Sequence, residues 1–396
     1  MSIYLDHAAT CFPRPPAVLA AVQQALQTTA SVGRGFGPAA RAAQETVDEV
    51  RAQLAAFLGL RAQDALVFTS GATAALNLAI HGTLARGKGG VVVTGPFEHH
   101  AVLRPLAEAV RRGACREVIQ VPPDDGFLAT PAALARHLGP EVRLVVLGAV
   151  SNVLGVRQDV AGWAAACRAH GVPLLVDASQ AVGLVDVSFA AWGADLLAFS
   201  GHKGLCGPPG VGGLCLGPGS RPASLLQGGT GGEQAHLDVQ PDRLPWAHEP
   251  GTLPVAAIAG LGAGLRWVQE RGVAQVRQHH YALTRRLVAG LVLCDAIDIP
   301  CPVPDVGIVT FTVRGWEPAS LAQLLDETFG IALGAGLSCA PAAHARLGTL
   351  PQGALRASVG LTTTEADIDH LVEALHQVAA VPVADGWTDG TRGASP

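Results

Sequence analysis

The stretch Leu196-Leu197-Ala198-Phe199-Ser200-Gly201-His202-Lys203-Gly204 joins a short apolar run to a glycine-flanked polar turn. Near-continuous apolar runs bounded by glycine and proline are typical of strands buried on both faces, as in a mostly parallel sheet. Similar runs occur at 66–69, 90–94, 117–121, 144–149, 173–177 and 213–216. Helical stretches separate many of them, which predicts βαβ crossovers. The sequence therefore predicts an α/β fold with a mostly parallel, seven-stranded sheet.

Flanking segments indicate a second, smaller domain. Residues 3–16 are expected to form an extended arm, followed by helices at about 17–28 and 39–58. A long irregular stretch at 227–254 follows the last run and is expected to be functional or interfacial. Helices are expected after residue 255. They are followed by a strand at 306–313, a helix at 318–329, a strand at 354–359 and a last helix at 365–379. We expect a large domain at 16–254, a small α+β domain made of 1–15 with 255–380, and a flexible tail at 381–396.

Composition excludes several classes of protein. Hydrophobic residues make up 49% of the 396 residues and charged residues 15%, which suffices for a large buried core. A net charge of −5 favours neither nucleic acid nor an anionic membrane surface as a partner. No apolar run is long enough to span a bilayer, and no signal peptide is expected. The eight cysteines include no Cys-x-x-Cys pair, so we expect no metal site, no disulfide framework and a reduced, cytoplasmic protein.

Lysine is scarce in this chain, which narrows the search for a nucleophile. Only Lys88 and Lys203 are lysines. Lys88 lies in a Gly-Lys-Gly-Gly turn, whereas Lys203 follows an apolar strand. An ammonium group is costly to bury there, so the free amine is expected to be a good nucleophile. A buried structural lysine without a partner is rare, and Lys203 is therefore the candidate.

A second motif, Thr69-Ser70-Gly71-Ala72-Thr73, lies between a predicted strand and a predicted helix. Glycine allows a ligand to approach the backbone closely, and the N–H groups, hydroxyls and dipole of a helix start bind phosphate. The same residue types also suit an ordinary helix N-cap. Taken alone, the motif leaves both interpretations open.

Asp177 ends the apolar run at 173–177, and Gln180 follows it closely. Open α/β sheets bind ligands at the carboxyl ends of their strands. An aspartate at that position can pair with a pyridinium N–H and keep such a ring electron-withdrawing. A helix N-cap is the alternative for this residue alone.

In chain order, these motifs supply a phosphate loop, an acid for a ring nitrogen and a lysine able to form a Schiff base. Here the chain resembles the class V aminotransferase group of fold-type I pyridoxal 5'-phosphate (PLP) enzymes, in particular the cysteine desulfurases and the related selenocysteine lyases. The resemblance covers most of the chain. Its motifs lie at Tyr4–Thr10, Thr69–Asn77, Glu98–Leu103, Ser151–Asn152, Val176–Gln180, Ser200–Gly204, Glu249–Pro254, Gly336–Pro341 and Leu355–Gly360.

The resemblance implies how the cofactor is held. Lys203 would carry PLP as a Schiff base, Asp177 would pair with the pyridine nitrogen, and Gln180 would donate to the phenolic oxygen. His99 would stack on the ring and help to move protons. The residues implied as phosphate contacts are Ala72, Thr73, Ser200 and His202. Thr252 matches a threonine that reaches the phosphate of a neighbouring subunit, which implies a homodimer with shared sites.

The resemblance also implies how the substrate is handled. Asn152, beside the cofactor, and Arg356 would bind the substrate carboxylate, for which an arginine fork is suited. Cys339 matches the thiol that accepts sulfur. The surrounding tract Gly334–Pro341 is predicted to be a glycine-rich loop in which a thiol is mobile and exposed, although a small buried thiol is the commoner fate of a free cysteine. Ala74, Gly334 and Ser338 stand where the family commonly has glutamate, arginine and histidine.

We therefore expect a PLP-dependent cysteine desulfurase that converts L-cysteine to L-alanine, with the sulfur transferred as a persulfide on Cys339. The sulfur would then pass to an acceptor protein or a small thiol. The alternatives are a selenocysteine lyase acting on L-selenocysteine, another PLP-dependent β-elimination or epimerase reaction, or a PLP-binding homologue without desulfurase turnover. No nucleic acid or membrane partner is expected.

Overall fold

The computed structural model describes residues 3–33, 35–231, 236, 238–301 and 304–380. The predicted tail at 381–396 therefore lies outside the described residues. The described chain divides into two compact units. The larger unit holds residues 10–151 and 156–277, and the smaller unit holds residues 3–9, 152–155 and 278–380. The domain bounds expected from the sequence stay a prediction.

The predicted seven-stranded sheet forms the centre of the larger unit, with strand order β2-β8-β7-β6-β5-β3-β4. β8 runs antiparallel to β2 and β7, while all the other neighbours are parallel. The strands are β2 (Ala65–Thr69), β3 (Val91–Thr94), β4 (Glu117–Gln120), β5 (Val142–Gly148), β6 (Leu174–Asp177), β7 (Leu196–Ser200) and β8 (Gly212–Leu216). Every strand except β8 therefore ends at the same edge of the sheet.

Burial explains why the strands of this sheet are so apolar. Every residue of β3, β6, β7 and β8 is buried. A strand covered on both faces needs apolar side chains at all positions and not at alternate ones. The continuous apolar runs in the sequence are the direct result.

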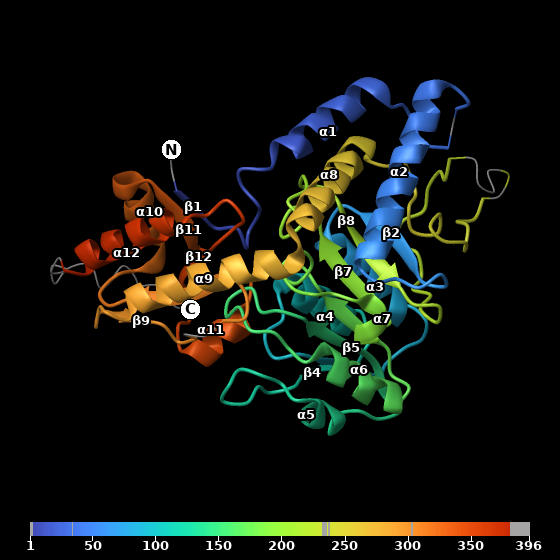
Figure 1. The fold of residues 1–396 in the computed structure, drawn as a ribbon. Coiled ribbons are helices and arrows are strands. Elements are labelled where there is room, and N and C mark those ends of the chain that lie inside the picture. The colour runs from blue at the N-terminus through green and yellow to red at the C-terminus, as the bar shows by residue number, and fades with distance from the viewer. Residues whose placement is uncertain (1–2, 34, 232–235, 237, 302–303, 381–396) are drawn as a thin grey trace, which may run out of the picture. The chain divides into compact units, whose positions relative to one another are not determined.

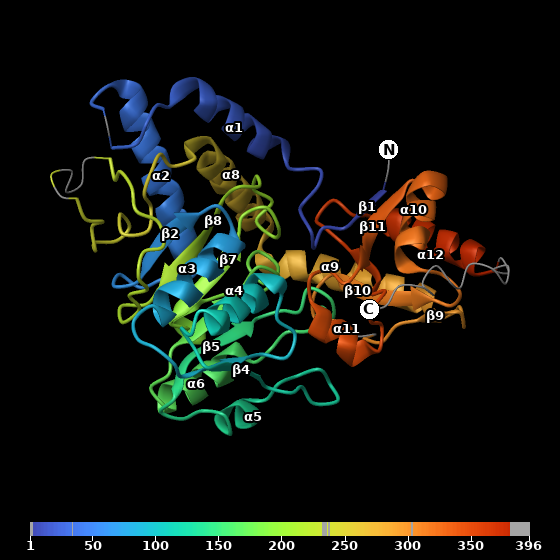
Figure 2. The same ribbon diagram turned by 180° about the vertical axis from the view of Figure 1, so that it is seen from behind.

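Helices cover the large sheet. They are α1 (Pro16–Thr28), α2 (Pro38–Phe57), α3 (Ala72–Leu84), α4 (His100–Arg111), α5 (Pro131–Ala135), α6 (Val160–Ala169), α7 (Phe189–Trp192) and α8 (Val255–Arg271). α8 packs against α1 and α2 (Figures 1 and 2), and α3 packs against β7, β8 and α4. Leu76 and Ile80 of α3 and Val102 and Leu106 of α4 contribute to one buried apolar cluster with the strands. Within 227–254 the described residues form neither helix nor strand.

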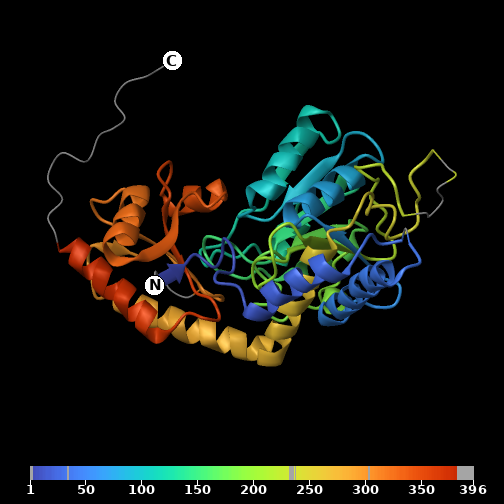
Figure 3. The ribbon, with the colours of Figure 1, turned by 90° about the horizontal axis from the view of Figure 1, so that it is seen from above.

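The smaller unit is built on a five-stranded sheet of order β1-β11-β12-β10-β9. Its strands are β1 (Ile3–Leu5), β9 (Ile297–Asp298), β10 (Ile308–Val313), β11 (Ile331–Gly336) and β12 (Ala354–Ser358), and its helices are α10 (Pro318–Phe329), α11 (Pro341–Leu347) and α12 (Glu365–Ala379). α9 (Val273–Leu291) enters this unit from the larger one. α9 and α12 lie side by side (Figure 3) and are joined by ion pairs from Arg286 to Glu365 and Asp369.

Two expectations for this unit need correction. Residues 3–5 of the predicted arm pair in parallel with β11 and so belong to the sheet. Residues 334–336, predicted as part of a loop, are the end of β11 and pair with β12. In both places backbone pairing with a neighbouring strand decides the conformation, and the local sequence does not show it. No helix among the described residues is both long and apolar enough to cross a membrane.

Candidate active site

Most of the predicted cofactor residues lie at one edge of the large sheet. β2 leads into residues 70–73, β3 into the segment before α4, β6 ends at Asp177, and β7 ends at Ser200 just before Lys203. These strands run in the same direction, so their carboxyl ends meet at a common edge. Open α/β sheets bind their ligands at this edge.

The segment between β2 and α3 has the geometry of an anion site. Gly71 has φ +135°, a conformation that residues with a side chain rarely adopt, and as the N-cap residue of α3 it offers no side chain of its own to the helix N–H groups. Ser200 at the end of β7 accepts a hydrogen bond from the Ala72 N–H at 3.2 Å. A Cβ at Gly212 would lie 2.8 Å from the Gly71 Cα, so glycine is required for β8 to pass this turn. Thr73 lies in the first turn of α3, whose N–H groups favour an anion.

Asp177 is buried, with 9% of its surface exposed. Its Oδ1 accepts hydrogen bonds from the N–H of Ser179, at 2.9 Å, and from the Ser179 hydroxyl. No described residue donates a hydrogen bond to Oδ2. One oxygen is thus fixed and the other remains for a partner. Gln180, also buried, lies in the same turn.

Lys203 lies in the turn after β7 and is half-buried. Its carbonyl accepts from the Cys206 N–H at 2.8 Å, and the carbonyl of His202 accepts from the Cys11 N–H at 2.8 Å. His202 Nδ1 lies 3.1 Å from the Thr10 hydroxyl. Residues 10 and 11 therefore hold the backbone that carries the lysine. The sequence predicted the strand and the lysine but not this contact with the chain's N-terminal segment.

His202 has an environment that favours the neutral ring. Burial lowers the pKa of His202 to about 4, and the positive charges of Lys203 and Arg14 act in the same direction. At neutral pH the ring is therefore neutral, so it can contact an anion by a hydrogen bond but not by an ion pair.

His99 is the N-cap of α4, and its Nδ1 accepts a hydrogen bond from the Ala101 N–H at 3.0 Å. This bond fixes the orientation of the ring, and in the neutral imidazole it leaves the proton on Nε2. The ring is partly exposed. An imidazole held in this way presents an N–H that can donate to a ligand.

In the smaller unit, Cys339 follows β11 on a strained turn. Ser338 has φ +45° and Cys339 has φ +58°, both in the left-handed region. This conformation costs about 1–3 kcal/mol for each residue other than glycine, and such strain clusters at functional sites. All eight cysteines lie in the described residues, and Cys339 is the one that is exposed. The predicted exposure of this thiol is therefore confirmed.

Arg356, Asn152 and Ser338 form one cluster in the smaller unit. Asn152 Nδ2 donates to the Ser338 carbonyl at 2.7 Å, and Arg356 Nη1 donates to the Asn152 carbonyl at 3.1 Å. Arg356 is 6% exposed and forms an ion pair with Asp6, which the sequence reasoning did not identify. Arg356 Nε is buried and has no hydrogen-bond partner among the described residues. The cluster joins the two residues predicted to bind a carboxylate to the backbone beside Cys339.

Gly334 makes room for this ion pair. It lies opposite Arg356 in the β11–β12 pairing. A Cβ at position 334 would come 3.1 Å from Asp6 Oδ1 and 3.4 Å from Arg356 Nε. Any larger side chain would press on the pair. Glycine at position 334 therefore leaves room for the Asp6–Arg356 ion pair.

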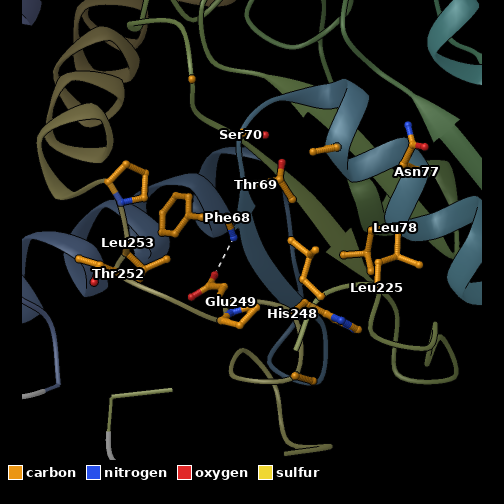
Figure 4. A pocket seen from close by; sticks show the side chains of 16 residues that line it. Phe68, Thr69, Ser70, Asn77, Leu78, Leu225, His248, Glu249, Thr252 and Leu253 are labelled. Carbon is orange, nitrogen blue, oxygen red and sulfur yellow. Dashed lines mark hydrogen bonds between the residues drawn. The ribbon is translucent and has the colours of Figure 1, made fainter. Parts of the chain in front are cut away.

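Thr252 is exposed and lines a cavity of about 410 Å³ in the larger unit, together with Thr69, Ser70 and Asn77 (Figure 4). The segment that carries it is anchored by Glu249. The Glu249 carboxylate pairs with both terminal nitrogens of Arg51 and accepts from the Phe68 N–H at 2.6 Å. This anchor joins the predicted subunit-reaching segment to β2, the strand that leads into the phosphate loop.

At one edge of the mostly parallel sheet lie a glycine turn that begins a helix, a buried aspartate and a turn with a lysine, an arrangement typical of fold-type I PLP-dependent enzymes. The chain belongs to the class V aminotransferase family, because the family model described as Aminotransferase class-V matches residues 3–371. This confirms the family expected from the sequence.

Individual relatives agree. The chain is 32% identical to a probable cysteine desulfurase of Methanothermobacter thermautotrophicus, covering 96% of this chain and 95% of that one. It is 34% identical to a cysteine desulfurase of Dickeya dadantii, with coverage of 95% and 91%. Its fold is similar to the apo structure of a cysteine desulfurase from Thermococcus onnurineus NA1, with a TM-score of 0.85 and 27% identity over 96% of this chain and 94% of that one.

Proposed function

We propose that this protein is a PLP-dependent cysteine desulfurase that converts L-cysteine to L-alanine and takes up the sulfur as a persulfide on Cys339. The observation that carries the proposal is the exposed Cys339 on its strained turn, in a chain whose relatives are named cysteine desulfurases. Because the other cysteines are buried or half-buried, this thiol is the one placed to meet a substrate.

The residues at the edge of the large sheet fit PLP. Asp177 keeps one carboxylate oxygen for a ring N–H, and the first turn of α3 together with the Ser200 hydroxyl offers donors to a phosphate. Lys203 lies in the turn beside Ser200, His99 presents its ring, and Gln180 lies near Asp177. When bound, PLP supplies an electron sink for the charge left after removal of a proton from the substrate α-carbon.

Lys203 has two tasks in this proposal: its Nζ would hold the cofactor, and its free amine would accept the proton from the substrate α-carbon as a general base. The hydrogen bonds that residues 10 and 11 make to the lysine turn keep its position fixed. His99 would move protons through Nε2, since Nδ1 is held by the Ala101 N–H.

Cys339 carries out the sulfur transfer. Its thiolate attacks the sulfur of the substrate, so an S–S bond forms and the substrate C–S bond breaks. The electron pair of the broken bond stays with carbon, which takes up a proton and leaves as the methyl group of alanine. One cysteine and one enzyme thiol thus give one alanine and one enzyme persulfide, and no further oxidant or reductant is needed.

Arg356 and Asn152 would orient the substrate through its carboxylate. Both already contact the backbone near Cys339 through the Ser338 and Asn152 carbonyls. The Asp6 ion pair holds the guanidinium in place before the substrate arrives. The substrate carboxylate would bind the guanidinium N–H groups that Asp6 and the Asn152 carbonyl leave unused.

The proposal also covers partners and location. We place the protein in the cytoplasm as a homodimer that gives its sulfur to an acceptor protein or small thiol. Thr252 supports the dimer because it is exposed on a segment anchored by the Arg51–Glu249 pair. Its hydroxyl would contact the phosphate bound by the neighbouring subunit.

A product assay on the purified protein tests this function. With L-cysteine and a reducing thiol we expect equal amounts of alanine and sulfide, while L-selenocysteine serves as the second substrate. Pyruvate and ammonia in place of alanine would indicate β-elimination, and racemised cysteine without sulfide would indicate epimerisation. Either result, or turnover of selenocysteine alone, would overturn the desulfurase proposal.

A further inference from the structure

One buried acid at the cofactor edge has no task in the proposed reaction. Glu98 is 1% exposed and lies just before His99, between β3 and α4. Its Oε1 accepts a hydrogen bond from the Gly148 N–H at 2.8 Å. Its Oε2 is also buried and has no hydrogen-bond partner in the described part of the chain. A carboxyl group buried without a cation is costly, so its retention here needs a reason.

Two glycines make the space that the Glu98 carboxyl occupies. A Cβ at Gly95 would lie 2.5 Å from Oε1, and a Cβ at Gly148 would lie 3.3 Å from Oε2. The first distance is shorter than side-chain atoms tolerate, so a side chain at residue 95 would displace the carboxyl. The fit is therefore close on two sides.

The position of the carboxyl joins two parts of the candidate site. Gly148 is the last residue of β5 and pairs with Asp177, the last residue of β6. Glu98 directly precedes His99, whose ring caps α4. One short side chain thus connects the segment of the ring-stacking histidine to the strand beside the aspartate.

The surroundings favour the protonated form of Glu98. Burial is the main cause that raises the pKa of Glu98 to about 8, and the negative charge of Asp177 acts in the same direction. Hydrogen bonds from the N–H groups of Gly148 and Gly95 oppose this shift but do not cancel it. Among the described residues, Asp177 is the charged group that shifts the pKa of Glu98. Two neighbouring carboxyl groups in a buried site cannot both ionise cheaply, so one of them keeps its proton. Because Oε1 accepts a backbone N–H, we assign the proton to Oε2.

We propose that Glu98 is a positioning residue: as a neutral carboxylic acid it ties the His99 segment to the end of β5 without adding a second negative charge beside Asp177. The proposal rests on the cofactor roles of Asp177 and His99 given above. It adds Glu98 as a third residue that fixes the positions of the other two. Shape and neutrality are the two properties that Glu98 must have.

Substitutions separate these properties. Glu98→Gln keeps the shape and is neutral at every pH, so the full-length protein should retain PLP and cysteine turnover within about twofold of the unmutated enzyme. Glu98→Asp is too short to reach the Gly148 N–H, and Glu98→Ala leaves a void between the two glycines. Both should lose PLP about tenfold faster on dilution, as expected when a hydrogen bond of about 1.4 kcal/mol is removed.

The pH dependence gives a readout that a merely structural side chain would not move. In the unmutated enzyme, ionisation of Glu98 above about pH 8 should speed the loss of PLP, because a second anion then faces Asp177. In Glu98→Gln this alkaline change should disappear. If Glu98→Gln loses PLP as fast as Glu98→Ala, or shows the same alkaline change as the unmutated enzyme, the proposal is wrong.

Infrared spectroscopy tests the protonation state without the cofactor. At neutral pH the unmutated chain should show the C=O stretch of a protonated carboxylic acid, and Glu98→Gln should lack it. Glu249→Gln is the matched control, because that buried carboxyl is paired with Arg51, whereas Glu98 has no cation beside it. If the band is missing in the unmutated chain, or if Glu249→Gln removes it, the proposal fails. This readout is independent of whether PLP binding, and with it the proposed function, holds.

Discussion

The edge of the large sheet and the Cys339 region of the smaller unit are built on different principles. At the sheet edge Asp177 and Ser200 are buried at the ends of their strands, and their side chains accept hydrogen bonds from backbone N–H groups. The Cys339 thiol is exposed on a strained turn, and its neighbourhood is held by an ion pair between Asp6 and Arg356. The first arrangement suits a tightly held cofactor, and the second suits a thiol that must give up its sulfur. Cofactor binding and sulfur transfer should therefore be separable by mutation.

The largest effect is expected at the sheet edge, for Lys203→Ala. Loss of the base alone should reduce turnover by about 10²–10⁴-fold, and loss of the bond to PLP adds to this. Borohydride reduction followed by peptide mass spectrometry should find the cofactor on Lys203 and not on Lys88, the only other lysine. Lys88→Ala is the control and should behave as the unmutated protein. A cofactor label on Lys88 would show that the cofactor is not held at the edge of the large sheet.

Cys339→Ala should break sulfur transfer while leaving the sheet edge intact. We expect PLP content and the spectral response to added cysteine to be unchanged, but alanine production from cysteine to fall by about a hundredfold. Some activity on selenocysteine should survive, because selenium leaves carbon more easily than sulfur does. After reaction with cysteine, the unmutated enzyme should carry one added sulfur on the Cys339 peptide. Cys294→Ala, at a half-buried cysteine, serves as the control. Normal turnover by Cys339→Ala would remove the persulfide from the mechanism.

Arg356→Leu should weaken substrate binding more than cofactor binding. Loss of charged hydrogen bonds to a carboxylate is expected to raise KM for cysteine by about tenfold to a hundredfold. Arg356→Lys should restore little of this, because an ammonium lacks the planar fork. PLP content measured by absorbance should stay constant in both variants. A loss of PLP that equals the loss of substrate affinity would show that the two regions are not separable.

The smallest effect is expected for Thr252→Ala. Removing one hydroxyl from a subunit contact should weaken PLP retention by about fivefold, the effect of one hydrogen bond of about 1 kcal/mol. The unfolding midpoint should not change, because Thr252 is exposed. Light scattering should report a dimer for both proteins. A fully active monomer would contradict the proposed sharing of sites between subunits.

The sequence was most informative where both faces of a strand are buried. The seven predicted runs correspond to the seven strands, and the four that are buried throughout, β3, β6, β7 and β8, need apolar residues at nearly every position. The same strands make Asp177 and Lys203 predictable, because a polar residue next to an apolar run marks the end of a strand. Glu98 lies in one of the motifs, but no local pattern predicts a role for it, since its burial against two glycines is visible only in three dimensions.

Pairing between distant segments was harder to predict. β11 contains Gly334 and Gly336, so it shows no apolar alternation, and its pairing with β1 and β12 determines its conformation. Asp6 and Arg356 are 350 residues apart in the chain, and no local pattern connects them. The left-handed conformation of Ser338 and Cys339 also has no local signal, because it is normally a property of glycine.

The exposure of Cys339 has a practical consequence. Seven of the eight cysteines are buried or half-buried, so a thiol-reactive dye added to the native, unmutated protein should label one position first. Because a persulfide forms a disulfide-linked adduct that a mild reductant cleaves, whereas a thiol forms a stable thioether, the two states can be counted on the same gel band. The fraction of molecules that carry sulfur on Cys339 can therefore be followed in time on the natural sequence, without an added reporter.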